Sequence, residues 1–149
     1  MQLIFPSYKF NIKQDKNRSC IFDIIRKKFV VLTPEEWVRQ HLVRYLIDTC
    51  GCAASLIAIE KGLIINGLQK RFDVLVFNNL GKPILLAECK SPDVSLSNET
   101  FRQAAIYNQS LQVPHLLITN GVELLFCTYA ENYTDYTIAA KIPNYPFST

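Results

Sequence analysis

The chain has 149 residues, of which 49% are hydrophobic and 19% charged, and its formal net charge is +3. This composition is typical of a soluble globular protein, and the length suits a single domain over residues 1–149 with a substantial core. No apolar run approaches the roughly 20 residues that span a bilayer, and residues 1–9 lack the features of a signal peptide. We therefore expect a cytoplasmic protein without a membrane partner.

Five cysteines, an odd number, lie mostly in apolar stretches: Cys20, Cys50, Cys52, Cys89 and Cys127. This pattern indicates reduced thiols rather than a disulfide framework. The Cys50-Gly51-Cys52 segment and His41 are the obvious candidates for a zinc site. No second ligand pair follows at the spacing of a zinc finger, so a zinc site is not expected.

The beginning of the chain predicts a small β-structure followed by a helix. Alternating stretches predict two strands of an N-terminal β-hairpin and a short third strand, at 8–13, 19–25 and 28–32. The helix should begin with Thr33 as N-cap and Pro34 at its first position, and should end at about residue 48 or 49, before Gly51.

Two glutamates open this predicted helix. Glu35 shares a stripe with Val38 and Leu42, at spacings of three and seven, which predicts that it faces the core. Glu36 stands three residues after Thr33, and a capping box accounts for it. The alternative interpretation is that both glutamates only favour the helix N-terminus electrostatically.

The rest of the chain predicts further strands and a second helix. We expect strands at 55–60 and 63–65 with a turn at Lys61-Gly62, and then strands at 72–77 and 84–90. A helix should follow at about 98–110. Strands at 115–119 and 122–129 should be joined by a type I′ turn at Asn120-Gly121, and the tail after residue 131 should be irregular.

Asp73, Glu88 and Lys90 carry charges on two strongly apolar predicted strands. Glu88 and Lys90 share one face of their strand, and Cys89 points to the other face. If the strands pair as a hairpin, Asp73 lies close to Glu88. A divalent cation is the natural neutraliser of two buried carboxylates, and such a site suits phosphoester chemistry.

Basic residues near this site offer contacts to a phosphate backbone. The net charge is too small to indicate a nucleic-acid-binding domain by itself, so local clusters matter more. Lys70 and Arg71 stand just before Asp73, where they would meet approaching DNA. Another basic cluster, 26–28, precedes the first helix. The alternative interpretation of both clusters is that they are solvated strand ends.

With these residues the chain resembles the PD-(D/E)XK nuclease superfamily, whose motif is an Asp on one strand and Glu-x-Lys on the next. Phe72 replaces the proline that often precedes the Asp. The resemblance is closer still to the N-terminal nuclease domain of type I restriction enzyme R subunits. It is carried, in the order of that family, by the segments 32–40, 71–76, 86–92, 103–108 and 118–121.

The resemblance implies an α/β fold of the restriction-endonuclease-like sandwich type, with a central mixed β-sheet flanked by helices. It implies a metal-dependent DNA endonuclease that uses Mg²⁺, with Mn²⁺ as a substitute. Asp73, Glu88, the backbone carbonyl of Cys89 and Glu35 would bind the metal, and Lys90 would position the attacking water and stabilise charge on the phosphorus.

Gln103 and Tyr107 lie four residues apart on the second predicted helix and so share a face. In the resembling nucleases, residues of this Gln-x-x-x-Tyr pattern act beside the active site, orienting the lysine or contacting DNA. A tyrosine at the edge of the core with a surface glutamine is the alternative interpretation.

Three other functions stay open from the sequence. The chain could bind DNA or a partner subunit without cutting, or serve as an assembly domain of a larger restriction–modification complex. The motif could also be a coincidence, with Glu88 and Lys90 forming a salt pair on an edge strand. Partner subunits, a homo-oligomer, the DNA preference and the number of metal ions cannot be read from these residues.

Overall fold

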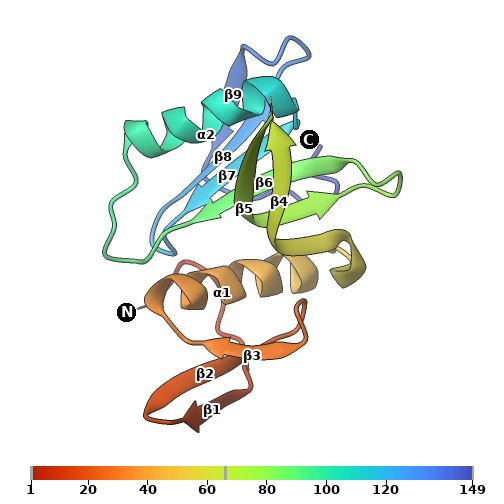
Figure 1. Cartoon of the computed structure of the whole chain (residues 1–149). Coiled ribbons are helices and arrows are strands. Elements are labelled where there is room, and N and C mark those ends of the chain that lie inside the picture. Colours follow the sequence, from red (N-terminus) through yellow and green to blue (C-terminus); the bar gives the residue numbers. More distant parts are fainter. Residues whose placement is uncertain (1, 66, 149) are drawn as a thin grey trace.

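The computed structural model describes residues 2–65 and 67–148, except for the side chains of Ile65 and Leu68. Its elements form four layers (Figure 1): a small three-stranded sheet, helix α1, a six-stranded sheet and helix α2. Helix α1 therefore lies between the two sheets, and α2 covers the opposite face of the large sheet. The order agrees with the predicted sandwich.

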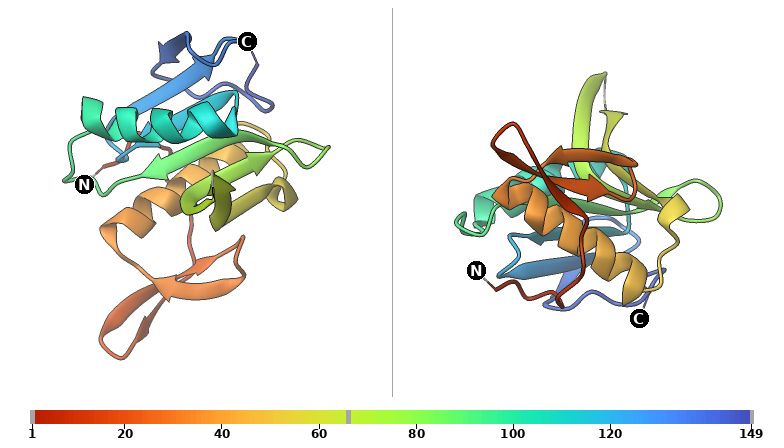
Figure 2. Two further views of the ribbon diagram at one scale, coloured as in Figure 1. Left: turned by 45° about the horizontal axis from the view of Figure 1, so that its top comes forward. Right: turned by 90° about the horizontal axis from the view of Figure 1, so that it is seen from below.

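The small sheet is antiparallel, with β1 (Ile12–Asp15), β2 (Arg18–Asp23) and β3 (Lys28–Val31) in that order. It crosses beneath α1, as the right-hand view of Figure 2 shows. The first predicted strand began too early, because the rings of Tyr8 and Phe10 pack against His41 on α1 instead of entering a sheet. The second ends at Asp23, whose carboxylate accepts the N–H groups of the following turn.

Helix α1 (Pro34–Asp48) confirms the predicted start and end. The Thr33 hydroxyl accepts a hydrogen bond of 3.0 Å from the Glu36 N–H, and proline occupies the first helical position. The chain leaves the helix through Gly51, whose φ of +83° is favourable only for glycine. A short 3₁₀ helix, η1 (Ala54–Leu56), leads into the large sheet.

The large sheet contains six strands in chain order: β4 (Ile57–Ile65), β5 (Leu68–Phe77), β6 (Pro83–Cys89), β7 (His115–Thr119), β8 (Leu124–Tyr129) and β9 (Tyr136–Ala139). Only β6 and β7 are parallel among these pairs, and α2 (Asn98–Leu111) makes the crossover between them. The sheet is thus mixed, and β6 lies in its interior rather than at an edge. A parallel pair requires such a crossover connection, which the left-hand view of Figure 2 shows above the sheet.

Two apolar cores hold the layers together. The first lies between α1 and the sheet and includes Val38, Leu42 and Val74, all fully buried. The second lies between α2 and the sheet and includes Leu75, Leu86 and Ala104. Successive residues of β5 and β6 therefore alternate between the two cores, as residues of a strand buried on both faces must.

The region predicted as two short strands, 55–60 and 63–65, is one strand, β4. Lys61 and Gly62, the predicted turn, pair with Phe72 and Arg71 of β5. The irregularity lies at Glu60 instead, where φ is +53° and the register omits a pair. A single left-handed residue kinks the strand without ending it.

The connection at Asn120-Gly121 is not a type I′ turn, which needs positive φ at both central residues. Only Gly121 has positive φ there, +86°. The side chain of Asn120 instead accepts the N–H groups of Val122 and Glu123 at 2.9 and 2.7 Å. This Asx arrangement produces a longer connection between β7 and β8 than the sequence predicted.

The tail predicted to be irregular contributes the edge strand β9, which pairs with β8. Beyond it, Ile142 and Phe147 are buried in the first core. The prediction was wrong because every side chain of β9 is exposed, so the strand has no apolar alternation to reveal it. In the described part of the chain, neither helix has the length and apolarity to cross a membrane.

Candidate active site

The β5–β6 hairpin brings Asp73 and Glu88 together. Val74 pairs with Ala87, and the same antiparallel register, extended by one residue, places Asp73 opposite Glu88. The two carboxyl groups lie near enough for the charge of Asp73 to raise the pKa of Glu88. The predicted convergence of these two residues at one end of the hairpin is therefore present.

Asp73 is fixed from two sides. One carboxylate oxygen accepts a hydrogen bond of 2.7 Å from the backbone N–H of Cys89, and the other accepts one of 3.3 Å from the Arg39 guanidinium on α1. The Asp73 side chain is only 16% exposed. Its position is thus set jointly by β6 and α1, and it joins the two faces of the sheet.

Glu88 is the less well satisfied of the two. Its Oε1 is buried and has no hydrogen-bond partner in the described structure. Burial, followed by the nearby charge of Asp73, raises its pKa to about 8, although the positive charges of Lys70 and Lys90 act in the opposite direction. In the metal-free protein at neutral pH, Glu88 is therefore mostly protonated, and a strong cation would be needed to ionise it.

Glu88 opens into a cavity of about 580 Å³ between α2 and strands β5 and β6, which we call the α2 cavity. Four of the predicted site residues line it together: Glu88, Lys90, Gln103 and Tyr107. The remaining lining residues are Lys70, Phe72, Thr100, Ala104, Ile106 and Ser110. The crossover helix thus presents the Gln-x-x-x-Tyr pair to the Glu-x-Lys strand; the roles of these residues in catalysis stay predictions.

The two basic residues predicted to contact DNA separate in the structure. Lys70 faces the α2 cavity, with its amine 5.1 Å from the centre of the Tyr107 ring. Arg71 is exposed on the adjacent side of β5, where it pairs with Gly62. Among the described residues, neither Lys70 nor Lys90 has a carboxylate within ion-pair distance. The cavity therefore contains two amines that can receive an anion.

Cys89 lies between the paired acids but turns its thiol away from the cavity. The side chain is 1% exposed and packs in the core on the α1 side with Leu85 and Ala87. Burial, and next the charge of Asp73, raise the pKa of this thiol, which keeps it protonated. This leaves only the backbone carbonyl of Cys89 as a candidate ligand on this residue, and its role remains a prediction.

The two glutamates of α1 have exchanged their expected environments. Glu36 is buried, whereas the Glu35 side chain is 45% exposed. The expectation that Glu35 faces the core was wrong, because polar partners rather than the apolar stripe determine which glutamate turns inward. Glu35 still reaches the site indirectly: its Oε1 lies 3.2 Å from the Arg39 nitrogen that contacts Asp73.

Glu36 does not complete a capping box, since its carboxylate has other partners. It accepts hydrogen bonds from Arg26 at 2.8 Å, from Arg39 at 3.0 Å and from Gln40 at 3.0 Å. Arg26 and Gln40 in turn bind Asp23, at 2.6 and 3.0 Å. We call Asp23, Arg26, Glu36, Arg39 and Gln40 the paired network.

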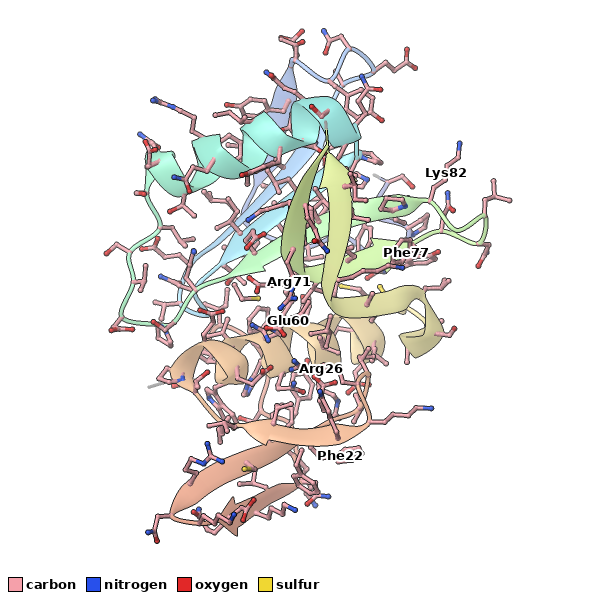
Figure 3. The ribbon with its side chains drawn as sticks, viewed as in Figure 1. Phe22, Arg26, Glu60, Arg71, Phe77 and Lys82 are labelled. Atoms are coloured by element: carbon pink, nitrogen blue, oxygen red, sulfur yellow. The ribbon has the colours of Figure 1, made fainter. Side chains whose placement is uncertain are left out.

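The sequence interpretation missed the paired network. It joins the β2–β3 turn, α1 and Asp73, and its edge includes Glu60 of β4, which lies 3.4 Å from Arg26 and 3.3 Å from Arg39. Figure 3 shows Arg26 and Glu60 facing each other across α1. The spacing of Arg39 at three and four residues from the glutamates was the one available signal.

Among the described residues, no three acidic, histidine or cysteine side chains form a ready metal cluster. Mg²⁺ does not need one, because it is commonly held by one or two carboxylates with water completing the shell. The unpartnered Oε1 of Glu88 beside Asp73 offers oxygen ligands of this kind. The residues present therefore fit a hard divalent cation.

The interpretation of Glu88 and Lys90 as a salt pair on an edge strand is wrong on both counts. Strand β6 has β5 and β7 as neighbours, so it is interior. The described ion pairs do not include one between Glu88 and Lys90, and the two side chains face the same cavity.

Comparison with solved structures shows the same fold in two other proteins. A fragment classed as an HsdR subunit of a type I restriction enzyme from Vibrio vulnificus YJ016 superposes with a TM-score of 0.56 at 21% identity. The match covers 78% of this chain and 24% of that one, so the chain spans about a quarter of its length. A protein of the DUF820 group from Anabaena variabilis ATCC 29413, classed as a nuclease, has a TM-score of 0.50 at 8% identity, over 87% and 81% of the two chains.

No curated protein matches the chain significantly. The family model for the type I restriction enzyme R protein N terminus (HSDR_N), however, matches residues 34–143. This range begins at α1 and includes Asp73, Glu88, Lys90 and the whole of α2. The chain therefore belongs to the family of type I restriction enzyme R protein N-terminal domains.

Proposed function

We propose that the chain is a metal-dependent deoxyribonuclease that hydrolyses phosphodiester bonds at the α2 cavity. The observation that carries the proposal is the placement of an unpartnered buried oxygen of Glu88 beside Asp73, in a cavity with two unpaired amines. A fold leaves such groups unsatisfied mainly at functional sites, because burying them costs stability.

Asp73 and Glu88 would hold Mg²⁺ or Mn²⁺, together with the backbone carbonyl of Cys89. Bound there, the ion would neutralise charge on the phosphate and lower the pKa of a bound water. The carboxylate of Asp73 is oriented for this role by the Cys89 N–H and by Arg39. Glu88 must lose its proton to take part, so the ion and the proton compete for the same oxygens.

Lys90 supplies the positive charge of the reaction. Its amine faces the same cavity as Glu88 and can donate hydrogen bonds to the attacking water and to a non-bridging phosphate oxygen. Water attacks the phosphorus in line with the leaving oxygen, the P–O bond to that oxygen breaks, and the leaving oxygen takes a proton. Charge builds on the phosphate oxygens in this step, where a fixed ammonium group is most effective.

Gln103 and Tyr107 border Lys90 from the helix side. The amide of Gln103 can hold the Lys90 amine in position or donate to the phosphate, and Tyr107 can contact the DNA. Glu35 lies outside the cavity but within one guanidinium of Asp73, so it can influence the metal ligands through Arg39.

The experiment is cleavage of supercoiled plasmid and of labelled single-stranded, duplex and branched DNA. We expect products in Mg²⁺ or Mn²⁺ and none in EDTA, and no products from Asp73→Ala at equal purity. Equal activity of the wild type and Asp73→Ala would reveal a contaminating nuclease and reject the proposal. Absence of cleavage on every substrate, with DNA binding retained, would instead support a non-cutting module that serves a larger restriction complex.

A further inference from the structure

The α2 cavity has a shape that selects one kind of DNA. Its helix wall extends from Thr100 to Ser110, which is about 15 Å along α2 at the rise of an α-helix. A volume of about 580 Å³ spread over that length leaves a mean cross-section near 40 Å², roughly 6 Å on a side. A duplex, whose minor groove alone is about 6 Å wide, cannot enter such a space.

The walls of the cavity match the two halves of a nucleotide. Lys70 and Lys90 supply amines without carboxylate partners in the described structure, which suits a phosphate. Tyr107 and Phe72 supply aromatic rings, which suit a base, since every base can stack on a ring regardless of its sequence.

Lys70 connects the two halves. Its amine lies 5.1 Å from the Tyr107 ring centre and 5.7 Å from the Phe72 ring centre. Contacts of this kind contribute only about 0.5–1 kcal/mol at accessible sites, so an arriving phosphate can draw the amine away. The face of Tyr107 that Lys70 leaves would then be open to a base.

We propose that the α2 cavity binds an unpaired stretch of DNA next to the scissile phosphate, with a base on Tyr107 and a phosphate between Lys70 and Lys90. The inference rests on the proposed function and adds to it the substrate class: overhangs, flaps or single strands rather than continuous duplex. A closed duplex would have to unpair and extrude a nucleotide to reach Glu88.

Binding is the test, because it does not depend on cleavage. Fluorescence anisotropy in EDTA compares a short oligothymidine, a blunt hairpin duplex closed by its loop, and the same hairpin with a four-nucleotide overhang, at matched salt. We expect the oligothymidine and the overhang to bind at least tenfold more tightly than the blunt hairpin. Equal affinities for overhang and blunt hairpin would overturn the inference.

Two pairs of variants locate the preference. Tyr107→Leu should weaken overhang binding about tenfold, because stacking on one ring typically contributes that much, whereas Tyr107→Phe keeps the ring and should bind like the wild type. Lys70→Ala should reduce the slope of log affinity against log salt by about 0.7, the change expected for one phosphate contact on a single strand. Lys82→Ala, an exposed residue at the far end of the hairpin in Figure 3, should leave that slope unchanged.

The outcomes separate this inference from the proposed function. Loss of overhang preference in Tyr107→Leu but not in Tyr107→Phe supports the inference even if no DNA is cut. Cleavage of blunt duplex at the rate of overhang DNA, with equal binding, rejects the inference and leaves the nuclease proposal intact. If Tyr107→Leu fails to fold by circular dichroism, the salt slopes of Lys70→Ala and Lys82→Ala decide, and identical slopes reject the inference.

Discussion

The paired network and the α2 cavity are two groups of charged residues that share Asp73 as their boundary, yet they are built on opposite rules. In the network, Asp23 accepts four hydrogen bonds and Glu36 three from side chains, and each guanidinium contacts carboxylates on several elements. In the cavity, Glu88 has an oxygen with no partner in the described structure, and two amines stand unpaired.

This difference separates stability from chemistry. A buried charge that has every partner contributes to the fold, and removing one member exposes the others to the full cost of an uncompensated charge. A charge without partners costs stability in the resting protein and is available to a ligand. Substitutions in the network should therefore unfold the protein, and substitutions in the cavity should spare the fold.

The largest effect is expected at the network. Asp23 is fully buried, and Asp23→Ala would leave Arg26 and Gln40 without their acceptor. We expect a loss of about 3–5 kcal/mol in the free energy of unfolding, measured by urea denaturation. Asp15→Ala, at an exposed residue, is the matched control and should change it by less than about 0.5 kcal/mol.

A loss below about 1 kcal/mol for Asp23→Ala would mean that the network is not what stabilises the fold. The acid dependence gives a second check. Burial alone would raise the pKa of Asp23, but the hydrogen bonds from Arg26 and Gln40 outweigh it and lower that pKa below 3.8. The stabilisation is therefore present above the unfolded value and is lost as pH falls through the lower folded value.

The next effect is expected in the cavity. Lys90→Ala should slow DNA cleavage a hundredfold or more, which corresponds to about 3 kcal/mol of transition-state stabilisation. The free energy of unfolding should stay within about 0.5 kcal/mol of the wild type, because Lys90 has no ion pair in the described structure. Lys82→Ala, which lies far from the cavity (Figure 3), should retain full activity.

Plasmid nicking and urea denaturation of the same protein samples check this dissociation. A fall in stability that accounts for the lost activity of Lys90→Ala would erase the distinction between the two regions. Retained activity would remove Lys90 from the reaction altogether.

The sequence could predict the parts that depend on local rules. Thr33 and Pro34 mark the start of α1, and the predicted hairpin places Asp73 beside Glu88 because pairing of two adjacent strands is a local event. The crossover between β6 and β7 follows from the handedness and length of such connections. These predictions agree with the structure.

The parts that failed depend on partners distant in the chain. Glu36 turns inward because Arg26, ten residues earlier, and Arg39 meet it there, and no periodicity of α1 contains that information. Strand β9 forms only because β8 offers a free edge. The depth of Glu88 likewise depends on α2 closing over β6, so its raised pKa was beyond sequence reasoning.

A smaller effect concerns pH in the metal-free protein. Burial and the charge of Asp73 raise the pKa of Glu88 from 4.5 to about 8, so between these values the folded state holds a proton that the unfolded state has released. This contribution to stability is fully present below about 4.5 and is lost as pH rises through about 8. The free energy of unfolding should fall across this window with a slope of at most about 1.4 kcal/mol per pH unit.

Urea denaturation in EDTA between pH 5 and about 8.5 measures this slope. Glu88→Gln, which cannot ionise, should flatten the profile and be at least as stable as the wild type at the alkaline end. Glu123→Gln, at an exposed glutamate, should reproduce the wild-type slope. Identical profiles for wild type and Glu88→Gln would show that Glu88 is not the group that titrates.

The smallest effect tests whether a cation completes the cavity as arginine completes the network. At ten times its dissociation constant, Mg²⁺ should stabilise the folded chain by about 1.4 kcal/mol, a rise of a few degrees in Tm, relative to NaCl of equal ionic strength. Asp73→Ala should lose this rise. Because Glu88 holds a proton at pH 7, binding should also release nearly one proton, which calorimetry detects as a dependence of the heat on the ionisation enthalpy of the buffer. The same rise in Asp73→Ala, or binding without proton release, would place the ion elsewhere and leave Glu88 without the partner that its buried oxygen calls for.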